Sequence, residues 1–238
     1  MSEPLALVVG LGNPGQQHQY NRHNAGVMFL QRLCEKFKGE LRAESKFHGK
    51  SGRIMVNGAE VRLLFPTTYM NKSGMAVASM AQYYKIAPEQ ILVAYDELDL
   101  AIGTTKLKKG GGAGGHNGVR DVLSALGSSE FLRLRFGIAH PGSASKVIDY
   151  VLNDFSRDDA ISIEKEFDKA LAIMPLLVEG KLQVAMNELH TDPAEKAAMK
   201  AKQAEKAGKR PASAEGSGAA SPGVEDSGAA SSRDKPNE

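Results

Sequence analysis

The sequence begins with an apolar run that ends in closely spaced glycines, and this junction restricts the fold around it. Leu5–Val9 predicts a buried strand, and the glycines of residues 10–15 follow it with the spacing G-x-G-x-x-G. In dinucleotide-binding folds such glycines open directly into a helix, whose first N–H groups hold the pyrophosphate. Here Pro14 lies inside the motif, and the polar residues 16–24 come before the first helical pattern. The junction therefore predicts a turn and a polar loop at the carboxyl end of a strand, where α/β proteins bind ligands.

Strand and helix patterns alternate along most of the chain. Strands are predicted at 46–56, 60–65, 91–94, 104–108 and 131–138, and Asn57-Gly58 is a strong signal for a hairpin between the first two. Apolar residues recur at helical spacing over 30–37, 77–84, 119–126 and from Ile163 to about His190. Pro175 is expected to kink or divide the last of these helices. The fold class is therefore α/β, a single domain with a twisted mixed sheet flanked by helices.

The C-terminal segment differs in composition from the rest. Of the 47 residues from 192 to 238, 27 are Ala, Gly, Ser or Pro, and only Met199 and Val224 are larger apolar residues. Such a segment cannot bury enough apolar surface to offset the entropy lost on ordering. We therefore predict a folded domain over residues 1–191 and a low-complexity, disordered tail over residues 192–238.

Charge and cysteine content limit the partners and the compartment. Lys and Arg number 30 and Asp and Glu 28, so net charge implies no partner, but 106–135 holds six basic and two acidic residues and 149–168 two basic and seven acidic. A single cysteine, Cys34, cannot form an intrachain disulfide, which fits a reducing compartment. The sequence lacks both an apolar run of roughly 20 residues and a signal-peptide pattern. These features predict a cytoplasmic protein.

Several common catalytic patterns are missing, and a set of polar loop residues is left. The sequence lacks G-x-S-x-G, a complete P-loop and histidine pairs with the i, i+4 spacing of a helical zinc site. A carboxylate can hold the tautomer of a histidine, which can then take a proton from water, and asparagine amides suit an ester next to a peptide. The candidates on four predicted loops are Asn13, His23, Asn71, Asp96 and Asn117.

Each candidate also has a structural interpretation. Loop asparagines are commonly turn formers or helix caps, and Asn117, two residues before Val119, fits an N-cap. A single loop histidine is often structural, Asp96 could simply end its strand, and the glycines of 110–118 could form a flexible connector. At the level of residue patterns these alternatives stay open.

Basic residues alternate on two of the predicted strands. Lys106 and Lys108 have this spacing on one strand, and Arg133 and Arg135 have it on another. One face of a sheet edge would then present several cations, as binding to a phosphate backbone requires. The alternative is an ordinary solvated face.

Six motifs occur in order between residues 10 and 142: GLGNPG, NRHNAG, TTYMNKSG, ILVAYDELDL, GGGAGGHNG and FLRLRFGIAHPG. Together they resemble the bacterial peptidyl-tRNA hydrolase family, and the resemblance extends to about residue 190. It implies a single α/β domain that hydrolyses the ester between a peptide and the 3′-terminal adenosine of tRNA. It also implies a monomer that acts on peptidyl-tRNA, without a membrane partner and without a metal or organic cofactor.

The resemblance also assigns roles to residues. It makes His23 the catalytic histidine and Asp96 the aspartate paired with it. The positions matching the amides that arrange water, ester and peptide are Asn13, Asn71 and Asn117, with Met70 beside them in the site wall. The positions matching those that hold tRNA phosphates are Lys106, Lys108 and Arg135.

The loop before His23 departs from the family pattern N-P-G-x-x-Y-x-x-T-R-H-N. His18 stands at the Tyr position and Asn21 at the Thr position, and Tyr20 is displaced by two residues. Both a histidine and a tyrosine ring can stack on a base or hydrogen-bond a phosphate. We therefore expect His18 to preserve the contact to the tRNA end, with Tyr20 as the alternative.

Two functions of other classes compete with the hydrolase. A non-catalytic RNA-binding module would use the same basic face and polar loops. A nucleotide-dependent oxidoreductase rests on the glycine spacing alone, and the missing adjacent helix disfavours it.

Overall fold

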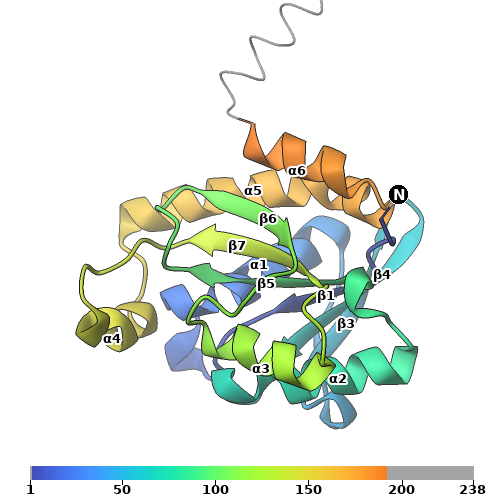
Figure 1. Ribbon diagram of the computed structural model, residues 1–238, viewed down its shortest axis with the longest axis horizontal. Helices are drawn as coiled ribbons and strands as arrows, with labels where there is room; N and C mark the ends of the chain where they lie inside the picture. The colour runs from blue at the N-terminus through green and yellow to red at the C-terminus, as the bar shows by residue number, and fades with distance from the viewer. Residues whose placement is uncertain (1, 192–238) are drawn as a thin grey trace, which may run out of the picture. The chain divides into compact units, whose positions relative to one another are not determined.

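A seven-stranded mixed sheet forms the centre of the protein in a computed structural model, which describes residues 2–191 (Figure 1). The strands and helices, in chain order, are β1 (Leu7–Gly10), α1 (Ala25–Phe37), β2 (Arg42–Glu44), β3 (Gly49–Val56), β4 (Ala59–Pro66), α2 (Ser73–Tyr84), β5 (Ile91–Glu97), β6 (Thr105–Lys109), α3 (Asn117–Leu126), β7 (Leu132–Gly137), α4 (Val147–Leu152), α5 (Arg157–Val178) and α6 (Leu182–His190).

The sheet has a parallel centre and antiparallel edges. Its strand order is β2-β3-β4-β1-β5-β7-β6, in which β4, β1, β5 and β7 are parallel to one another and β2, β3 and β6 are added antiparallel. The β3–β4 hairpin turns at Asn57 and Gly58, whose φ angles of 49° and 82° fit the tight turn expected from the sequence. The α/β class and the mixed sheet are confirmed.

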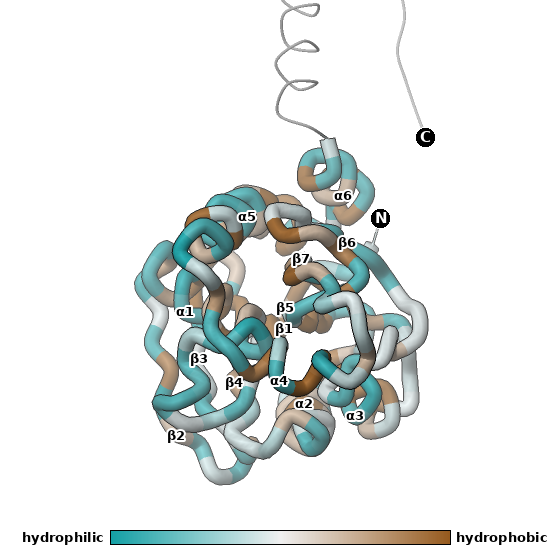
Figure 2. The backbone as a smooth tube through the Cα atoms, turned by 90° about the vertical axis from the view of Figure 1, so that its left-hand side faces the viewer, coloured by the Kyte–Doolittle hydropathy of each residue, from teal (hydrophilic) through white to brown (hydrophobic). Residues whose placement is uncertain are grey.

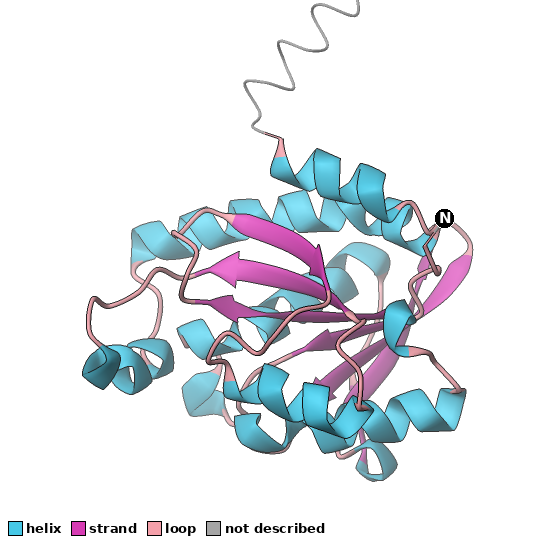
Figure 3. Ribbon diagram, in the orientation of Figure 1, coloured by secondary structure: helices cyan, strands magenta, loops and turns pink. Residues whose placement is uncertain are grey.

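Helices cover both faces of the sheet (Figure 3). Side chains on alternate residues of β1 and β5 enter two separate cores. Val8 and Leu92 pack with α1, α5 and α6 on one face, whereas Val9 and Val93 pack with α2 and α3 on the other. Strands β1 and β5 are therefore buried on both sides, and the polar side chains of β5 lie at its carboxyl end, at Asp96 and Glu97.

The start of α1 lies unusually close to the sheet. A Cβ atom added at Gly26 would collide with the carbonyl oxygen of Ala94 on β5, and one added at Gly10 would collide with the carbonyl of Gly26. Glycine at both positions thus lets the amino end of α1 rest on β1 and β5. This contact fixes the 3₁₀ turn η2 (Arg22–Asn24), which leads into α1, beside the end of β5.

Some boundaries differ from the sequence-based expectation. The last helical segment was expected to kink or divide at Pro175. It divides instead around Gly180, between α5 and α6, and the φ of 68° at Gly180 suits the residue after a helix end. A proline removes only one backbone hydrogen bond in the last turns, so α5 continues to Val178. The strand expected from residue 46 begins at Gly49, because Ser45–Phe47 form a 3₁₀ turn. The elements β2 and α4 were not expected.

Two other expectations concern the chain outside the sheet. The disordered tail expected over 192–238 lies outside the described residues. Within residues 2–191, no helix is long and apolar enough to cross a membrane.

Candidate active site

The polar loops at the carboxyl ends of the parallel strands meet around one cavity. Asn13 follows β1 and Asp96 lies on β5; His23 belongs to η2, Asn71 to the 3₁₀ turn η4 (Met70–Lys72), and Asn117 begins α3. All five line a cavity of about 520 Å³, together with Met70. Figure 1 shows the arrow of β7 pointing to this end of the sheet, where α4 also lies. The structure thus brings the five candidates from the four predicted loops together around one cavity.

His23 and Asp96 form a buried pair. The Nδ1 atom of His23 lies 2.9 Å from Oδ1 and 3.0 Å from Oδ2 of Asp96. The Asp96 side chain is only 2% exposed and that of His23 14%. Since Nδ1 faces the carboxylate, it carries a proton, and the lone pair of the neutral ring is on Nε2. The residue is thus arranged as a base toward the cavity that it lines.

A second histidine contacts the same carboxylate, and residue patterns did not indicate it. Nε2 of His116 lies 3.0 Å from Oδ1 of Asp96, and its Nδ1 accepts the backbone N–H of Val119 at 3.3 Å. Because Nδ1 is an acceptor, the proton of His116 is on Nε2, and His116 donates to Asp96. His116 is also the N-cap of α3, so the assignment of the cap to Asn117 was wrong. Asn117 is already the first residue of α3, whereas His116 stands at the position before the helix, from which a side chain can accept a free N–H group.

The contacts among Asp96, His23 and His116 shift the pKa values of Asp96 and His23. Burial favours a protonated Asp96, but the charges and hydrogen bonds of His23 and His116 outweigh it and hold the pKa of this carboxyl well below its usual range. Burial lowers the pKa of His23, but the charge and the hydrogen bond of Asp96 outweigh it, so that the pKa lies above its usual value. We call these three hydrogen-bonded residues, His23, Asp96 and His116, the catalytic centre from here on, a name that refers to the role proposed for them below.

Asn13 is held in place by hydrogen bonds from both directions. Its backbone N–H donates to Oδ1 of Asn24 at 2.8 Å, and its carbonyl accepts from Nδ2 of Asn24 at 3.0 Å. The side-chain Oδ1 of Asn13 accepts the backbone N–H of Met70 at 3.1 Å. Since the oxygen is used in this way, Nδ2 is the group that Asn13 offers to the cavity. Asn24, which was not among the site candidates, therefore fixes the backbone of this loop next to His23.

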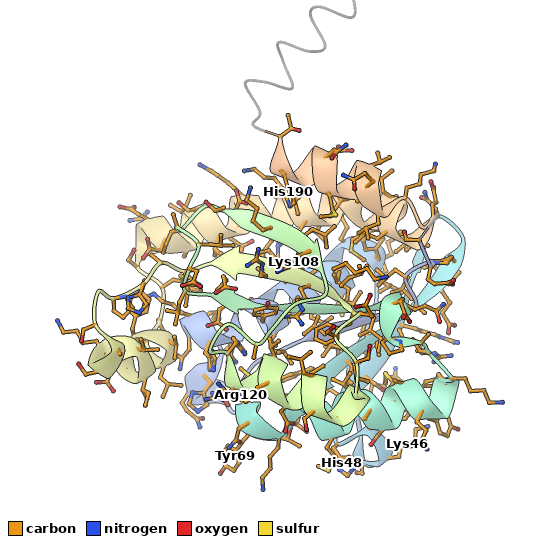
Figure 4. The ribbon with its side chains drawn as sticks, in the orientation of Figure 1. Lys46, His48, Tyr69, Lys108, Arg120 and His190 are labelled. Carbon is orange, nitrogen blue, oxygen red and sulfur yellow. The ribbon has the colours of Figure 1, made fainter. Side chains whose placement is uncertain are left out.

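Asn71 and Asn117 are the exposed asparagines of the cavity. Both residues are exposed and line it. Oδ1 of Asn117 accepts from Nη1 of Arg120 at 2.7 Å, which leaves its Nδ2 as a donor. Tyr69, 74% exposed, lines the cavity beside Met70 and was not among the candidates (Figure 4 labels Tyr69 and Arg120).

Part of the cavity wall is apolar. It is made by Val147, Ile148, Val151 and Leu152 of α4. Sequence reasoning missed this helix, although the pairs Val147/Val151 and Ile148/Leu152 have the i, i+4 spacing of a helical face. The cavity therefore joins donors for a polar ligand to a surface for an apolar one.

His18 and Tyr20 lie away from this cavity. Neither residue is among those that line it. Nδ1 of His18 lies 3.1 Å from Nδ2 of Asn21, whereas Tyr20 is 60% exposed, with its hydroxyl 3.3 Å from Nε2 of Gln19. The structure thus places the two rings in different surroundings on the same loop.

The basic residues of β6 and β7 share one edge of the sheet. Lys106 pairs with Arg135 and Lys108 with Arg133 in the ladder, so that the four side chains alternate as expected. We call Lys106, Lys108 and Arg135 the cationic edge. Figure 4 shows Lys108 on this edge, with His190 of α6 above it. Arg135 is tied to the cavity, because its Nη1 lies 3.4 Å from Oε2 of Glu97, a lining residue.

Arg133 is buried, although its spacing on the strand had suggested a basic face open to solvent or to phosphates. It is 2% exposed and donates to the carbonyl oxygens of Gly111 and Gly112. Its guanidinium also lies 4.6 Å from the ring centroid of Phe131. Arg133 therefore anchors the glycine-rich loop to the sheet and is a structural residue.

The catalytic centre is the group that comes nearest to a metal site among residues 2–191. Its ligand atoms lie within 4.8 Å of one another. A metal would need the lone pair of Nε2 on His116, yet this nitrogen carries the proton, because Nδ1 accepts from Val119. The hydrogen-bond pattern therefore fits proton transfer better than metal binding.

Comparison with known proteins identifies the family. A family model described as peptidyl-tRNA hydrolase matches residues 7–199. The chain belongs to this family. The peptidyl-tRNA hydrolase of Marinobacter nauticus is 48% identical over 191 residues, which are 80% of this chain and 97% of that protein. That of Haemophilus influenzae is 50% identical over 192 residues, which are 80% of this chain and 98% of that protein.

A solved structure supports the same relationship. The crystal structure of peptidyl-tRNA hydrolase from Acinetobacter baumannii has 44% sequence identity and a TM-score of 0.77, and the match covers 80% of this chain and 98% of that one. The family resemblance and the fold expected from the sequence are thereby confirmed.

Proposed function

We propose that the chain hydrolyses the ester bond between the peptide and the tRNA of peptidyl-tRNA, and so recycles tRNA from stalled translation. Membership of the family supports this reaction. The observation that carries the mechanism is the pairing of His23 Nδ1 with both oxygens of Asp96, which leaves Nε2 as a base in a cavity lined by asparagines.

Proton transfer through His23 accounts for both halves of the reaction. Nε2 takes a proton from a water molecule whose oxygen attacks the ester carbonyl, and Asp96 stabilises the imidazolium that forms. When the carbon–oxygen bond to the adenosine breaks, the imidazolium returns the proton to the leaving 3′-oxygen. The products are a peptide acid and a tRNA with a free 3′-hydroxyl, and His23 is neutral again.

The asparagines bind the groups around the ester in this proposal. Nδ2 of Asn13 donates to the carbonyl oxygen as negative charge develops on it. Asn71 and Asn117 hold the peptide next to the ester, and Met70 also lines the cavity. A free ammonium at this place would lose its water without gaining a countercharge, so an N-blocked substrate is favoured.

Phosphate binding is assigned to the cationic edge. Lys106, Lys108 and Arg135 lie on two paired strands, and the pair Arg135–Glu97 joins them to the cavity. A backbone phosphate held there would place the end of the same tRNA near His23. Loop residues His18 and Tyr20 are the candidates for contact with the tRNA end.

The folded part is proposed to act alone. Residues 1–191 would form the catalytic domain, and a chain that ends at Thr191 should keep its activity. A monomer in the cytoplasm agrees with this proposal, as does the single half-buried Cys34, which has no disulfide partner among the described residues.

The deciding experiment measures the release of tRNA from N-acetyl-aminoacyl-tRNA by the purified chain. Release from the N-blocked substrate and slow release from the free-amine form are expected. A chain that binds the N-blocked substrate without releasing tRNA would instead be the RNA-binding module considered as the second function.

A further inference from the structure

Arg22 precedes His23 in the chain, but its side chain extends into a different part of the molecule. The side chain is only 11% exposed. Its Nη1 donates to the carbonyl oxygens of Tyr150 at 3.3 Å and Asn153 at 3.2 Å, at the carboxyl end of α4. Its guanidinium carbon lies 4.2 Å from the ring centroid of Tyr150. A buried cation thus occupies the end of α4 where the helix dipole favours positive charge.

The backbone on both sides strengthens the same junction. The N–H of Arg22 donates to the carbonyl of Asn153 at 3.1 Å, and Asn21 forms an antiparallel bridge with Asp154. Nη2 of Arg22 also lies 3.6 Å from Oδ2 of Asp159 on α5. The turn that carries His23 is therefore joined to α4 and to the start of α5 through one side chain and a short ladder.

α4 depends on these contacts. It is six residues long, which is too short for a helix to be stable by itself. It packs against η2 and against the 3₁₀ turn η6 (Ala144–Lys146), which directly precedes it in the chain. Figure 1 shows α4 at the edge of the ribbon, and Figure 2 shows it from the side on which it lies. The segment around Arg22 therefore provides part of the contacts that position α4, beside the hydrogen bond from the Tyr150 hydroxyl to the carbonyl oxygen of Ile138.

α4 is also the apolar wall of the cavity. Ile148 and Leu152 line the cavity and are 70% and 39% exposed, although both side chains are large and apolar. Val151 beside them is 8% exposed. Apolar side chains exposed toward a cavity gain from contact with an apolar ligand, because that contact removes them from water.

We propose that Arg22 is a positioning residue that holds the apolar wall of α4 at a fixed place relative to His23, and that this wall selects apolar side chains at the residue esterified to tRNA. The inference rests on the proposed function and adds a specificity element to it. Arg22 acts through α4 and takes no part in proton transfer. Its loss should therefore affect the discrimination between substrates more than the chemical step.

The test compares two substrates that differ at one side chain, N-acetyl-Phe-tRNA and N-acetyl-Gly-tRNA. The ratio of their kcat/KM values is measured for the full-length wild type, for Arg22→Met and for Ile148→Ala. Met keeps much of the apolar stem of Arg22 and removes all donors, and Ile148 is exposed enough to be shortened without disturbing the core. Arg157→Met, the same change at an exposed position of α5, is the matched control.

We expect the wild type to prefer the Phe substrate and both variants to lower this preference about tenfold, mainly through KM. A double variant that combines Arg22→Met with Ile148→Ala should lower the preference no further than either single variant, because both changes remove the same contact. The pH profile of kcat in Arg22→Met should match the wild type, since Asp96 and not Arg22 sets the proton affinity of His23. Arg157→Met should leave the ratio unchanged.

A measurement that does not depend on activity is the rate of hydrogen exchange at the backbone amides of residues 147–153. These amides should exchange faster in Arg22→Met than in Arg157→Met, whereas those of β5 should not change. If Arg22→Met does not fold, Arg22→Lys, which keeps the charge but not the two-carbonyl contact, serves in the same assays with the same expected direction.

The outcomes separate this inference from the function on which it rests. A wild type that cleaves neither substrate overturns the proposed function. A wild type that cleaves both, without preference or with a preference that Arg22→Met leaves intact, overturns the inference alone. So does a double variant whose losses add.

Discussion

The catalytic centre and the cationic edge both carry charged side chains, but the protein holds them in opposite ways. In the catalytic centre the side chains of Asp96, His116 and His23 are 2%, 7% and 14% exposed, and each is hydrogen-bonded within the group. On the cationic edge Lys108 is exposed, and Arg135 has a side-chain exposure of 24% and one long contact to Glu97. Buried groups with fixed geometry act on the chemical step, whereas exposed charges act on association and are screened by salt.

This contrast predicts its largest effect at His23. His23→Ala should lower kcat by about 10³-fold, because no other described residue offers a base to the cavity from the same place. Binding of N-acetyl-aminoacyl-tRNA should be retained, since the cationic edge is intact. Single-turnover release of tRNA and a separate binding titration measure the two quantities. His48→Asn, a change at an exposed histidine elsewhere, is the control. Normal turnover by His23→Ala would remove this residue from the mechanism.

A smaller loss with a shift in pH dependence is expected for Asp96→Asn. The plateau of kcat should fall by about 10²-fold, because the amide no longer stabilises the imidazolium. Asp96 raises the pKa of His23 against the effect of burial, so removing its charge lowers that pKa. His23 must be neutral to accept a proton, and the acid limb of the profile should therefore move to lower pH. An unmoved limb, or one at higher pH, would contradict this account.

His116 has two roles, the hydrogen bond to Asp96 and the cap of α3, and two substitutions can separate them. His116→Ala removes both the donor to Asp96 and the cap of α3, whereas His116→Asn keeps a cap and is too short to reach the carboxylate. Both variants should lose about tenfold in kcat. Only the alanine variant should lose roughly 1 kcal/mol of stability, which thermal unfolding measures. If the asparagine variant kept full activity, the bond to Asp96 would not matter for catalysis.

On the cationic edge the expected changes lie in KM. Lys108→Ala and Arg135→Ala should each raise KM by roughly fivefold and reduce the slope of log K against log salt by about 1, with kcat nearly unchanged. Lys50→Ala, an exposed lysine on β3, should leave both unchanged. Equal salt slopes for all three variants and the wild type would place the tRNA on another face.

The contrast also explains what residue patterns could predict. Polar residues where strands end suggested the candidates Asn13, His23, Asn71, Asp96 and Asn117, and the structure brings all five to one cavity. The hairpin at Asn57 and Gly58 follows from turn geometry that few residues adopt. These features depend on local preferences and on the direction of strands, and both can be derived from the sequence.

Features that depend on contacts distant in the sequence could not be predicted in this way. His116 lies 20 residues from Asp96 in the chain, and no local pattern distinguishes it from a loop histidine. Arg133 has the spacing of an exposed basic residue, but the glycine-rich loop folds over it and takes its donors. α4 is six residues long, and its apolar face is turned to a cavity and not to the core.

The smallest effect is expected in the loop that departs from the family pattern, at Tyr20 and His18. Tyr20 is 60% exposed, so its ring can stack on an unpaired base, whereas the ring of His18 is tied to Asn21. Tyr20→Ala should raise KM about threefold, and His18→Ala should change it by less than about twofold. Tyr20→Phe, which keeps the ring without the hydroxyl, should behave as the wild type if stacking is the contact. The value of KM for N-acetyl-aminoacyl-tRNA, measured at low salt, tests all three variants.

A KM defect in His18→Ala and none in Tyr20→Ala would assign the contact to the histidine at the family's tyrosine position. A loss of kcat in His18→Ala as large as in His23→Ala would mean that a second histidine takes part in proton transfer, and the sharp contrast between the catalytic centre and its surroundings would no longer hold.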